Sequence, residues 1–154
     1  PGETGEMQLK GPSITPGYWR APEATKAAFT DDGWLKTGDL ALEDEEGFTY
    51  IVGRSKDMYI SGGENVYPAE VENTYARHNA VLEAAVIGVP DTKWGEVGRA
   101  YLLMREGKSA SAEDLIRFGR ENLAPYKVPK SFVFVSDFPR TPAGKVQKHL
   151  LPRD

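Results

Sequence analysis

The segment Gly53–Glu72, GRSKDMYISGGENVYPAEVE, constrains the fold more than any other part of the chain. Residues 58–67 predict two short strands, and Gly62-Gly63 between them predict a tight turn, because glycine adopts positive φ without steric cost. Pro68 predicts the start of a helix directly afterwards, since proline fits the first helical turn and acidic residues follow it there. We therefore expect a hairpin that leads at once into a helix.

Residues 1–53 have the pattern of short strands separated by turns. About fifty residues of this kind bury too little apolar surface to form a good core alone. We therefore interpret residues 1–53 as the trailing β-rich subdomain of a larger N-terminal domain. The expected elements are strands at 6–10, 34–36, 39–42 and 48–52, and a short helix at 21–29.

After Arg54 the pattern changes to alternating α and β elements. The fold class expected is α+β, with a small C-terminal domain at 58–154 that contains a three-stranded sheet, flanking helices and a two-stranded hairpin. The core strands are expected at 81–89, 99–104 and 131–135, and the helices at 68–78, after the N-cap residue Ser111, and at 145–151.

Composition narrows the classes of function. The net charge of −4 gives no general attraction for nucleic acid or for an anionic membrane. The absence of cysteine excludes thiolate metal sites and fits a reducing, cytoplasmic location, and two histidines cannot build a histidine-rich metal centre. No apolar run is long enough to span a membrane. We predict no metal site in this chain.

The chain resembles the adenylate-forming enzymes, the superfamily of acyl-CoA synthetases, luciferases and peptide-synthetase adenylation domains. The resemblance extends over essentially the whole chain and is most specific in two segments. They are residues 53–72 and the run PRTPAGKVQK at 139–148. The string SGGENVYP is most similar to fatty-acyl and aryl-acid CoA ligases. In that family a large N-terminal domain precedes a small mobile C-terminal domain. The resemblance therefore implies domain boundaries at 1–53, 54–57 as hinge, and 58–154, and it implies that the chain is a fragment.

Lys145 is the catalytic candidate. Its loop contains two prolines and a glycine, which would hold the ammonium out at the loop tip, where it can stabilise charge in a transition state. In isolation a solvated turn lysine would be the more common explanation, and Lys148 is a competing lysine. The resemblance to the family's catalytic-lysine loop favours Lys145.

Asp39 and Arg54 are the nucleotide-binding candidates. A carboxylate beside glycine can accept hydrogen bonds from the two hydroxyls of a ribose, although a lone Thr-Gly-Asp is more often an ordinary turn. The Arg54 guanidinium suits phosphate or hydroxyl oxygens, and a salt bridge to Asp57 is an equally good explanation from the residues alone. By resemblance, Asp39 binds the ribose, Arg54 contacts the nucleotide and Lys56 is the hinge residue.

A site for CoA is expected from the hairpin and three other segments. By resemblance, the hairpin with Gly62 and Gly63 helps to line the pantetheine tunnel. An aromatic residue and several cations can receive the adenine and the phosphates of CoA. Ordinary packing and solvated charges are the alternatives. The remaining candidates are Trp94, Tyr126, Lys127 and Lys130.

The resemblance implies an ATP-dependent acyl-CoA synthetase as the parent protein. It would convert a carboxylic acid, expected to be a fatty acid, and ATP with Mg²⁺ into acyl-adenylate and pyrophosphate. CoA would then take the acyl group and release AMP. The partner of this chain would be its own N-terminal domain, and the chain alone is expected to be inactive. Two alternatives stay open: a non-catalytic nucleotide- or CoA-binding docking module, and a ligase whose acceptor is a carrier protein.

Overall fold

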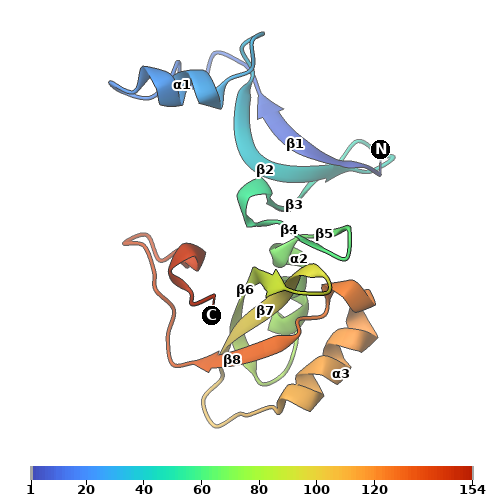
Figure 1. The fold of residues 1–154 in the computed structure, drawn as a ribbon. Coiled ribbons are helices and arrows are strands. Elements are labelled where there is room, and N and C mark those ends of the chain that lie inside the picture. The colour runs from blue at the N-terminus through green and yellow to red at the C-terminus, as the bar shows by residue number, and fades with distance from the viewer. Residues whose placement is uncertain (1, 154) are drawn as a thin grey trace. The chain divides into compact units, whose positions relative to one another are not determined.

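The computed structural model describes residues 2–153, and the chain divides into two compact units between Lys56 and Asp57. We call them unit 1 and unit 2 (Figure 1). Unit 1 contains β1 (Thr4–Leu9), α1 (Pro22–Ala28), β2 (Leu35–Glu43) and β3 (Thr49–Arg54), and the 3₁₀ turn η1 (Ser55–Asp57) follows. Unit 2 contains β4 (Tyr59–Ser61), β5 (Glu64–Val66), α2 (Pro68–Ala76), β6 (Val81–Asp91), β7 (Gly95–Met104), α3 (Ala112–Asn122), η2 (Pro125–Lys127), β8 (Ser131–Val135) and η3 (Lys148–Leu150).

Unit 1 is a three-stranded antiparallel sheet in the order β1-β2-β3. The two strands predicted at 34–36 and 39–42 form the single strand β2, which pairs with β1 on one side and β3 on the other. None of residues 2–52 is buried, so this sheet has no buried core of its own. Its exposed large apolar side chains include Tyr18, Trp19, Trp34, Phe48, Tyr50 and Ile51.

Unit 2 is built on a five-stranded sheet in the order β5-β4-β7-β6, with β8 also paired to β7. The β7–β8 pairing is parallel, and the other pairings are antiparallel. The α+β class is confirmed. The predicted three-stranded sheet with a separate hairpin is corrected, because the pairing of Ser61 with Gly95 joins the β4–β5 hairpin to the sheet.

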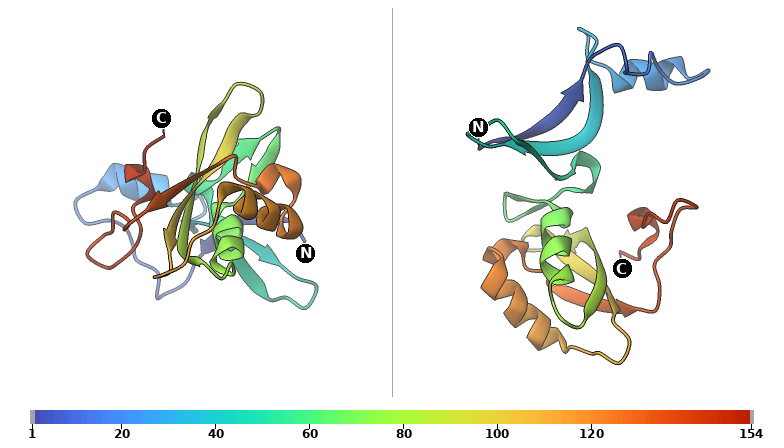
Figure 2. Two further views of the ribbon diagram at one scale, coloured as in Figure 1. Left: turned by 90° about the horizontal axis from the view of Figure 1, so that it is seen from below. Right: turned by 180° about the vertical axis from the view of Figure 1, so that it is seen from behind.

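Both faces of the unit 2 sheet are covered (Figure 2). Successive side chains of a strand point to opposite faces. Val86 on β6 belongs to one apolar cluster, together with residues of α2 and α3. Its neighbours Ala85 and Ile87 belong to a second cluster, with Phe138 and Leu151 of the C-terminal segment. The helices therefore cover one face, and the C-terminal segment covers the other.

The ends of the helices agree with the sequence in two cases and not in a third. Helix α2 begins at Pro68 as predicted. Helix α3 is capped by Ser111, whose hydroxyl accepts a hydrogen bond from the Asp114 N–H at 3.1 Å. The helix predicted at 145–151 is wrong, because only η3 is helical there. The preceding residues are extended, and the Gln147 N–H donates to the Pro139 carbonyl.

Candidate functional site

Asp39 and Arg54 lie directly opposite each other on β2 and β3. Arg54 Nε donates to Asp39 Oδ1 at 2.8 Å, and Arg54 Nη2 donates to the Thr37 carbonyl at 3.4 Å. The Asp39 N–H donates to the Thr37 hydroxyl. The strand register thus brings together the two predicted nucleotide-binding residues. The salt bridge that sequence reasoning left open for Arg54 forms with Asp39 and not with Asp57.

Lys56 lies in η1, is exposed, and is the last residue of unit 1. The division of the chain into units therefore falls within the segment 54–57. The role of Lys56 as a hinge stays a prediction, because a hinge is defined by a change of backbone torsion between two states.

Gly62 and Gly63 form the two-residue turn of the β4–β5 hairpin, with φ values of 63° and 89°. Positive φ at both positions is what a type I′ hairpin turn requires, so glycine is favoured at both. The two glycines differ in their surroundings. A Cβ at Gly62 would lie 2.8 Å from Cε3 of Trp94, whereas a Cβ at Gly63 would meet nothing within 4 Å.

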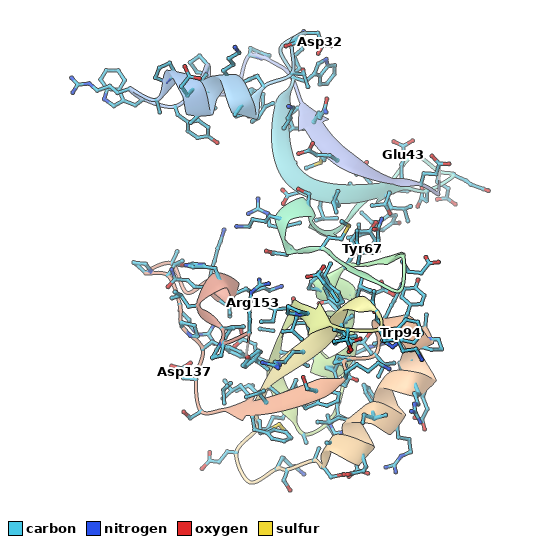
Figure 3. All side chains as sticks on the ribbon, in the orientation of Figure 1. Asp32, Glu43, Tyr67, Trp94, Asp137 and Arg153 are labelled. Atoms are coloured by element: carbon cyan, nitrogen blue, oxygen red, sulfur yellow. The ribbon has the colours of Figure 1, made fainter. Side chains whose placement is uncertain are left out.

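Trp94 lies in the turn between β6 and β7, next to the hairpin (Figure 3). Its carbonyl accepts a hydrogen bond from the Gly62 N–H at 2.9 Å. Trp94 as a whole residue remains 42% exposed, and Lys93 Nζ lies 4.7 Å from its ring centroid. Asp91 Oδ1 accepts from the N–H groups of Trp94 and Lys93, which lower the pKa of Asp91. The turn therefore holds Trp94 against Gly62 while its ring stays accessible.

The other predicted CoA residues lie in and after η2. Lys127 Nζ lies 2.7 Å from both carboxylate oxygens of Glu70 on α2, so its charge is already paired. Tyr126 is 37% exposed. Lys130 is exposed, and its charge also helps to lower the pKa of Asp91 beside Trp94. Lys130 thus belongs to the surroundings of the Trp94 turn, whereas Lys127 is tied to α2.

Lys145 is exposed and lies immediately after a turn closed by the Gly144 N–H and the Thr141 carbonyl. The sequence predicted Lys145 at the tip of the loop. Lys145 instead follows the turn, and its carbonyl accepts a hydrogen bond from the Thr141 N–H on the other side of the loop. The competing residue Lys148 is paired with Glu72 of α2 at 2.6 Å, and both side chains are about four-fifths buried. The structure therefore distinguishes the two lysines by their surroundings.

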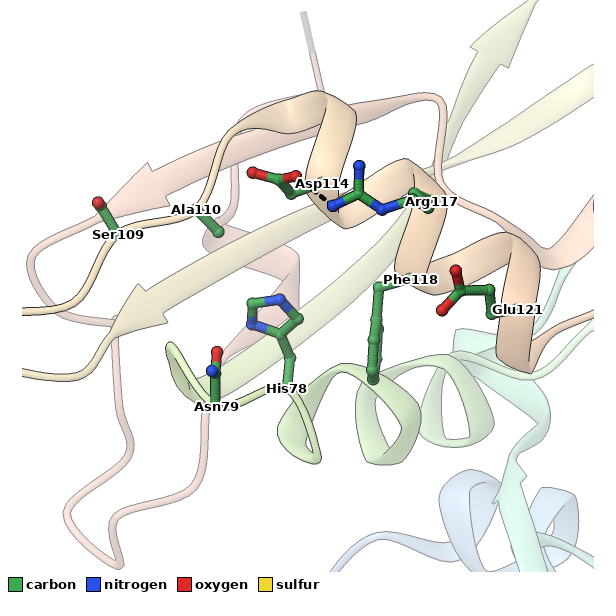
Figure 4. Close-up of a pocket in the computed structure, with 8 residues that line it drawn as sticks. All are labelled: His78, Asn79, Ser109, Ala110, Asp114, Arg117, Phe118 and Glu121. Atoms are coloured by element: carbon green, nitrogen blue, oxygen red, sulfur yellow. Dashed lines mark hydrogen bonds and ion pairs between the residues drawn. The ribbon is translucent and has the colours of Figure 1, made fainter.

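A separate pocket of about 290 Å³ lies between the end of α2 and the start of α3 (Figure 4). It contains none of the predicted site residues. His78 Nδ1 accepts from the Ala80 N–H, and its ring stands edge-on to Phe118, so this histidine is part of the packing between the helices. Within residues 2–153, no group of three or more acidic or histidine side chains could hold a metal ion, and no helix is long and apolar enough to cross a membrane.

Sequence reasoning assigned no role to Tyr59, Glu83 or Arg140. The Tyr59 ring lies against Gly88 and Gly98, and Arg140 forms an ion pair with Glu83. These partners are far apart in the sequence, so no local motif connects them. For Tyr59, the sequence signal was the pair of glycines, Gly88 and Gly98, which lie directly opposite each other on β6 and β7. Glycine inside a strand often marks a close approach by another group.

Comparison with protein families matches residues 70–145 to the AMP-binding enzyme C-terminal domain. The chain is 50% identical over 150 residues to the methyl-dioxo-octahydroindenyl-propanoyl:CoA ligase of Rhodococcus jostii; the match covers 97% of the chain and 29% of that protein. It is 48% identical over 151 residues to the long-chain-fatty-acid–CoA ligase of Bacillus subtilis, with 98% of the chain and 27% of that protein covered.

The fold is also that of a solved structure. The o-succinylbenzoate CoA synthetase of Bacillus subtilis, in complex with its acyl-adenylate intermediate, matches with a TM-score of 0.90 and 44% identity. That match covers 96% of the chain and 30% of the synthetase. The same synthetase in complex with ATP and magnesium ion gives a TM-score of 0.89 at 44% identity, with 97% and 30% covered. The chain spans less than a third of the length of each of these relatives.

Proposed function

Because this chain belongs to the adenylate-forming enzymes and carries their AMP-binding enzyme C-terminal domain, we propose that it is the C-terminal part of an ATP-dependent acyl-CoA synthetase. In the first half-reaction a carboxylate oxygen attacks the α-phosphorus of ATP, and pyrophosphate leaves with Mg²⁺. In the second half-reaction the CoA thiolate attacks the acyl carbonyl, and AMP leaves. The acid we propose is a fatty acid, although the named relatives act on acids of different shapes.

The contrast between Lys145 and Lys148 is the observation that carries this proposal. Lys148 is committed to Glu72, whereas Lys145 is exposed on a loop of fixed backbone. An ammonium that is held in place but still accessible can stabilise the charge that develops as a carboxylate attacks a phosphate. Lys145 therefore suits the adenylation step, and Lys148 suits a structural role.

Asp39 and Arg54 are proposed to hold the nucleotide. Arg54 fixes one oxygen of the Asp39 carboxylate, which orients the group so that its other oxygen can accept hydrogen bonds from the ribose hydroxyls. The guanidinium remains half exposed and can also reach an oxygen of the nucleotide.

The two half-reactions need different groups at one place, so we propose that unit 2 rotates about Lys56 between them. Rotation would withdraw Lys145 and present the Gly62-Gly63 hairpin to the pantetheine arm of CoA. Trp94 with its accessible ring and the exposed Lys130 suit the adenine and the phosphates of CoA. Tyr126 and Lys127 belong to the same proposed site, but a phosphate that binds Lys127 has to compete with Glu70.

The proposal is tested by Lys145→Ala in the full-length protein that contains this chain. Adenylate formation from acid and ATP is measured separately from thioester formation from pre-made acyl-adenylate and CoA. We expect the first reaction to fall and the second to survive. The exposed residue Lys108 provides the matched control, Lys108→Ala. Survival of both half-reactions in Lys145→Ala would refute the proposal and favour a non-catalytic docking module.

The remaining alternatives separate in the same system. An acyl carrier protein supplied in place of CoA would identify a carrier-protein ligase if it accepts the acyl group and CoA does not. The chain by itself lacks more than two thirds of the length of its relatives, and we propose that it is inactive alone. Release of pyrophosphate by the isolated chain would contradict that part of the proposal.

A further inference from the structure

The loop that carries Lys145 is a small hairpin. Thr141 and Lys145 are joined by a hydrogen bond from the Thr141 N–H to the Lys145 carbonyl at 2.8 Å, and Arg140 pairs with Val146. Gly144 has a φ of 82°, which is the left-handed residue typical of a turn followed by a bulge. Residues paired across a hairpin share a face, and adjacent residues alternate. Arg140 and Val146 therefore share one face, and Lys145 belongs to the opposite face.

The face of Arg140 and Val146 is attached to unit 2. Val146 packs against the apolar cluster that contains Phe138 and Leu151. The two terminal nitrogens of Arg140 bind the two carboxylate oxygens of Glu83 on β6, with Nη1 at 3.2 Å from Oε1. The hairpin is thus anchored by one apolar side chain and one guanidinium.

Arg140 also contacts the turn itself. Its Nη1 donates to the Gly144 carbonyl at 3.1 Å, in addition to its bond to Glu83. Gly144 is the residue directly before Lys145. One guanidinium therefore links the edge strand β6 to the peptide group from which Lys145 begins. The planar guanidinium can donate to both carboxylate oxygens of Glu83 and to the Gly144 carbonyl at the same time. A lysine ammonium lacks this planar arrangement of donors.

We propose that Arg140 is a positioning residue for Lys145: it holds the lysine hairpin to Glu83 so that the ammonium is presented in one orientation. This inference rests on the proposed function of Lys145 in adenylation. Arg140 touches no reacting atom in the proposal, since its side chain faces the sheet. Loss of Arg140 should leave Lys145 chemically intact but free to occupy many orientations, and a misplacement of about 1 Å can cost a factor of about 100 in rate.

The experiment compares four variants of the full-length protein: Arg140→Ala, Arg140→Lys, Glu83→Gln and Lys145→Ala. Adenylate formation should fall about 100-fold in Arg140→Ala through kcat, with little change in KM. Thioester formation from pre-made adenylate should stay within about twofold, because that step does not use the lysine. Arg140→Lys keeps the charge but not the fork, so it should restore only part of the loss. Glu83→Gln removes the partner's charge and should lower adenylation in the same direction.

Amide exchange gives a readout that does not depend on the proposed chemistry. In the 154-residue chain, the amides of Gly144 and Gln147 donate hydrogen bonds inside the hairpin. We expect them to exchange about tenfold faster in Arg140→Ala, since this variant loses both the link to Glu83 and the hydrogen bond to the Gly144 carbonyl. Arg117, which forms an exposed ion pair with Asp114 on α3, provides the matched control. Arg117→Ala should change neither the exchange nor the adenylation rate.

The outcomes separate this inference from the proposed function. Full adenylation activity in Arg140→Ala, together with its loss in Lys145→Ala, would overturn the positioning role alone. An equal fall of both half-reactions in Arg140→Ala would also overturn it, because the effect would then be a general loss of structure. Full adenylation activity in Lys145→Ala would refute the proposed function itself, whatever the result for Arg140.

Discussion

Tyr59→Phe is expected to stabilise unit 2. The Tyr59 side chain is only 2% exposed, and its hydroxyl has no hydrogen-bond partner among residues 2–153. Its ring lies across the opposed glycines of β6 and β7; a Cβ at Gly88 would come within 2.5 Å of the Tyr59 Cβ. The space over Gly88 and Gly98 therefore fits the Tyr59 ring closely. The substitution by phenylalanine would keep the ring and remove the unpaired hydroxyl.

The magnitude follows from the contrast with Tyr75. A buried donor without a partner costs about 1–3 kcal/mol, so Tyr59→Phe should raise the free energy of unfolding by about 1–2 kcal/mol. The Tyr75 hydroxyl is equally buried but donates to the Leu115 carbonyl at 3.1 Å. Tyr75→Phe should therefore lower the free energy of unfolding by about 1 kcal/mol. The same atom is removed in both variants, and the two effects have opposite signs.

Both effects should be independent of pH near neutrality. Burial raises the pKa of both hydroxyls, and the nearby charge of Glu96 raises that of Tyr59 further, so both stay protonated between about pH 6 and 9. The assay is urea unfolding of the 154-residue chain, followed by the amide signals of β6 and β7, which report unit 2 alone. In thermal unfolding, each kcal/mol should appear as about 4–8 °C. A destabilised or unchanged Tyr59→Phe would refute the reasoning, because it would mean that the hydroxyl is hydrogen-bonded, for instance to a buried water.

Three further predictions concern the turns and helices of unit 2. Gly62→Ala should destabilise the hairpin more than Gly63→Ala although both residues have positive φ, because only at Gly62 would a methyl group meet Trp94; Trp94→Ala should remove most of this difference in urea unfolding. Gly119→Ala should lower the unfolding midpoint, although alanine is about 1 kcal/mol better than glycine in a helix. The new methyl group would collide with the buried Tyr75 hydroxyl, which donates to the Leu115 carbonyl of α3. An equal or higher midpoint would contradict this expectation. The Ser111 hydroxyl at the N-cap of α3 is the main cause that lowers the pKa of Asp114, and the Arg117 guanidinium is the second. The stability that Asp114 contributes is therefore present above its unfolded pKa of about 3.9, and it is lost as the pH falls through the lower folded pKa. Asp114→Asn should flatten that acid limb of an unfolding-midpoint titration, and a limb of unchanged steepness would count against the assignment.

Local patterns in the sequence predicted the parts of the fold that depend on local physics. The apolar run from Val81 to Val89 predicts a buried strand because nearly every residue in it is apolar, and β6 covers it. Pro68 and Ser111 predict the starts of α2 and α3 because the physics of a helix start is contained in a few residues. The same holds for the glycine turn of the hairpin, whose two positive φ values follow from the pair of glycines.

The features that the sequence did not predict depend on partners far along the chain. The residues after Gly144 look helical, but Val146 pairs with Arg140, so the chain is extended before η3. The hairpin joins the sheet through Gly95, more than thirty residues later, and no pattern near Ser61 announces that pairing.

The same limit applies to the site. The resemblance identified Asp39 and Arg54, but their mutual ion pair is a consequence of the β2–β3 register. The pairs Lys127–Glu70 and Arg140–Glu83 each join residues 57 positions apart. Sequence reasoning names the residue types that a reaction needs, and the long-range pairings decide which of those side chains are already occupied.

The position of β8 in the sheet has a consequence for synthesis of the chain on the ribosome. β7 pairs with β6 across the three residues 92–94, but it pairs with β8 only after the intervening α3, so that Arg99 meets Ser131. Strands that are close in the sequence, such as β6 and β7, pair fast. The pairing of β7 with β8 closes a longer loop and costs more entropy. Until residue 131 emerges, the edge of β7 that carries Ala100 and Leu102 has no strand beside it. An unpaired apolar edge is a template for association with other chains, so a ribosome that pauses while α3 is being made would prolong the exposure of this edge.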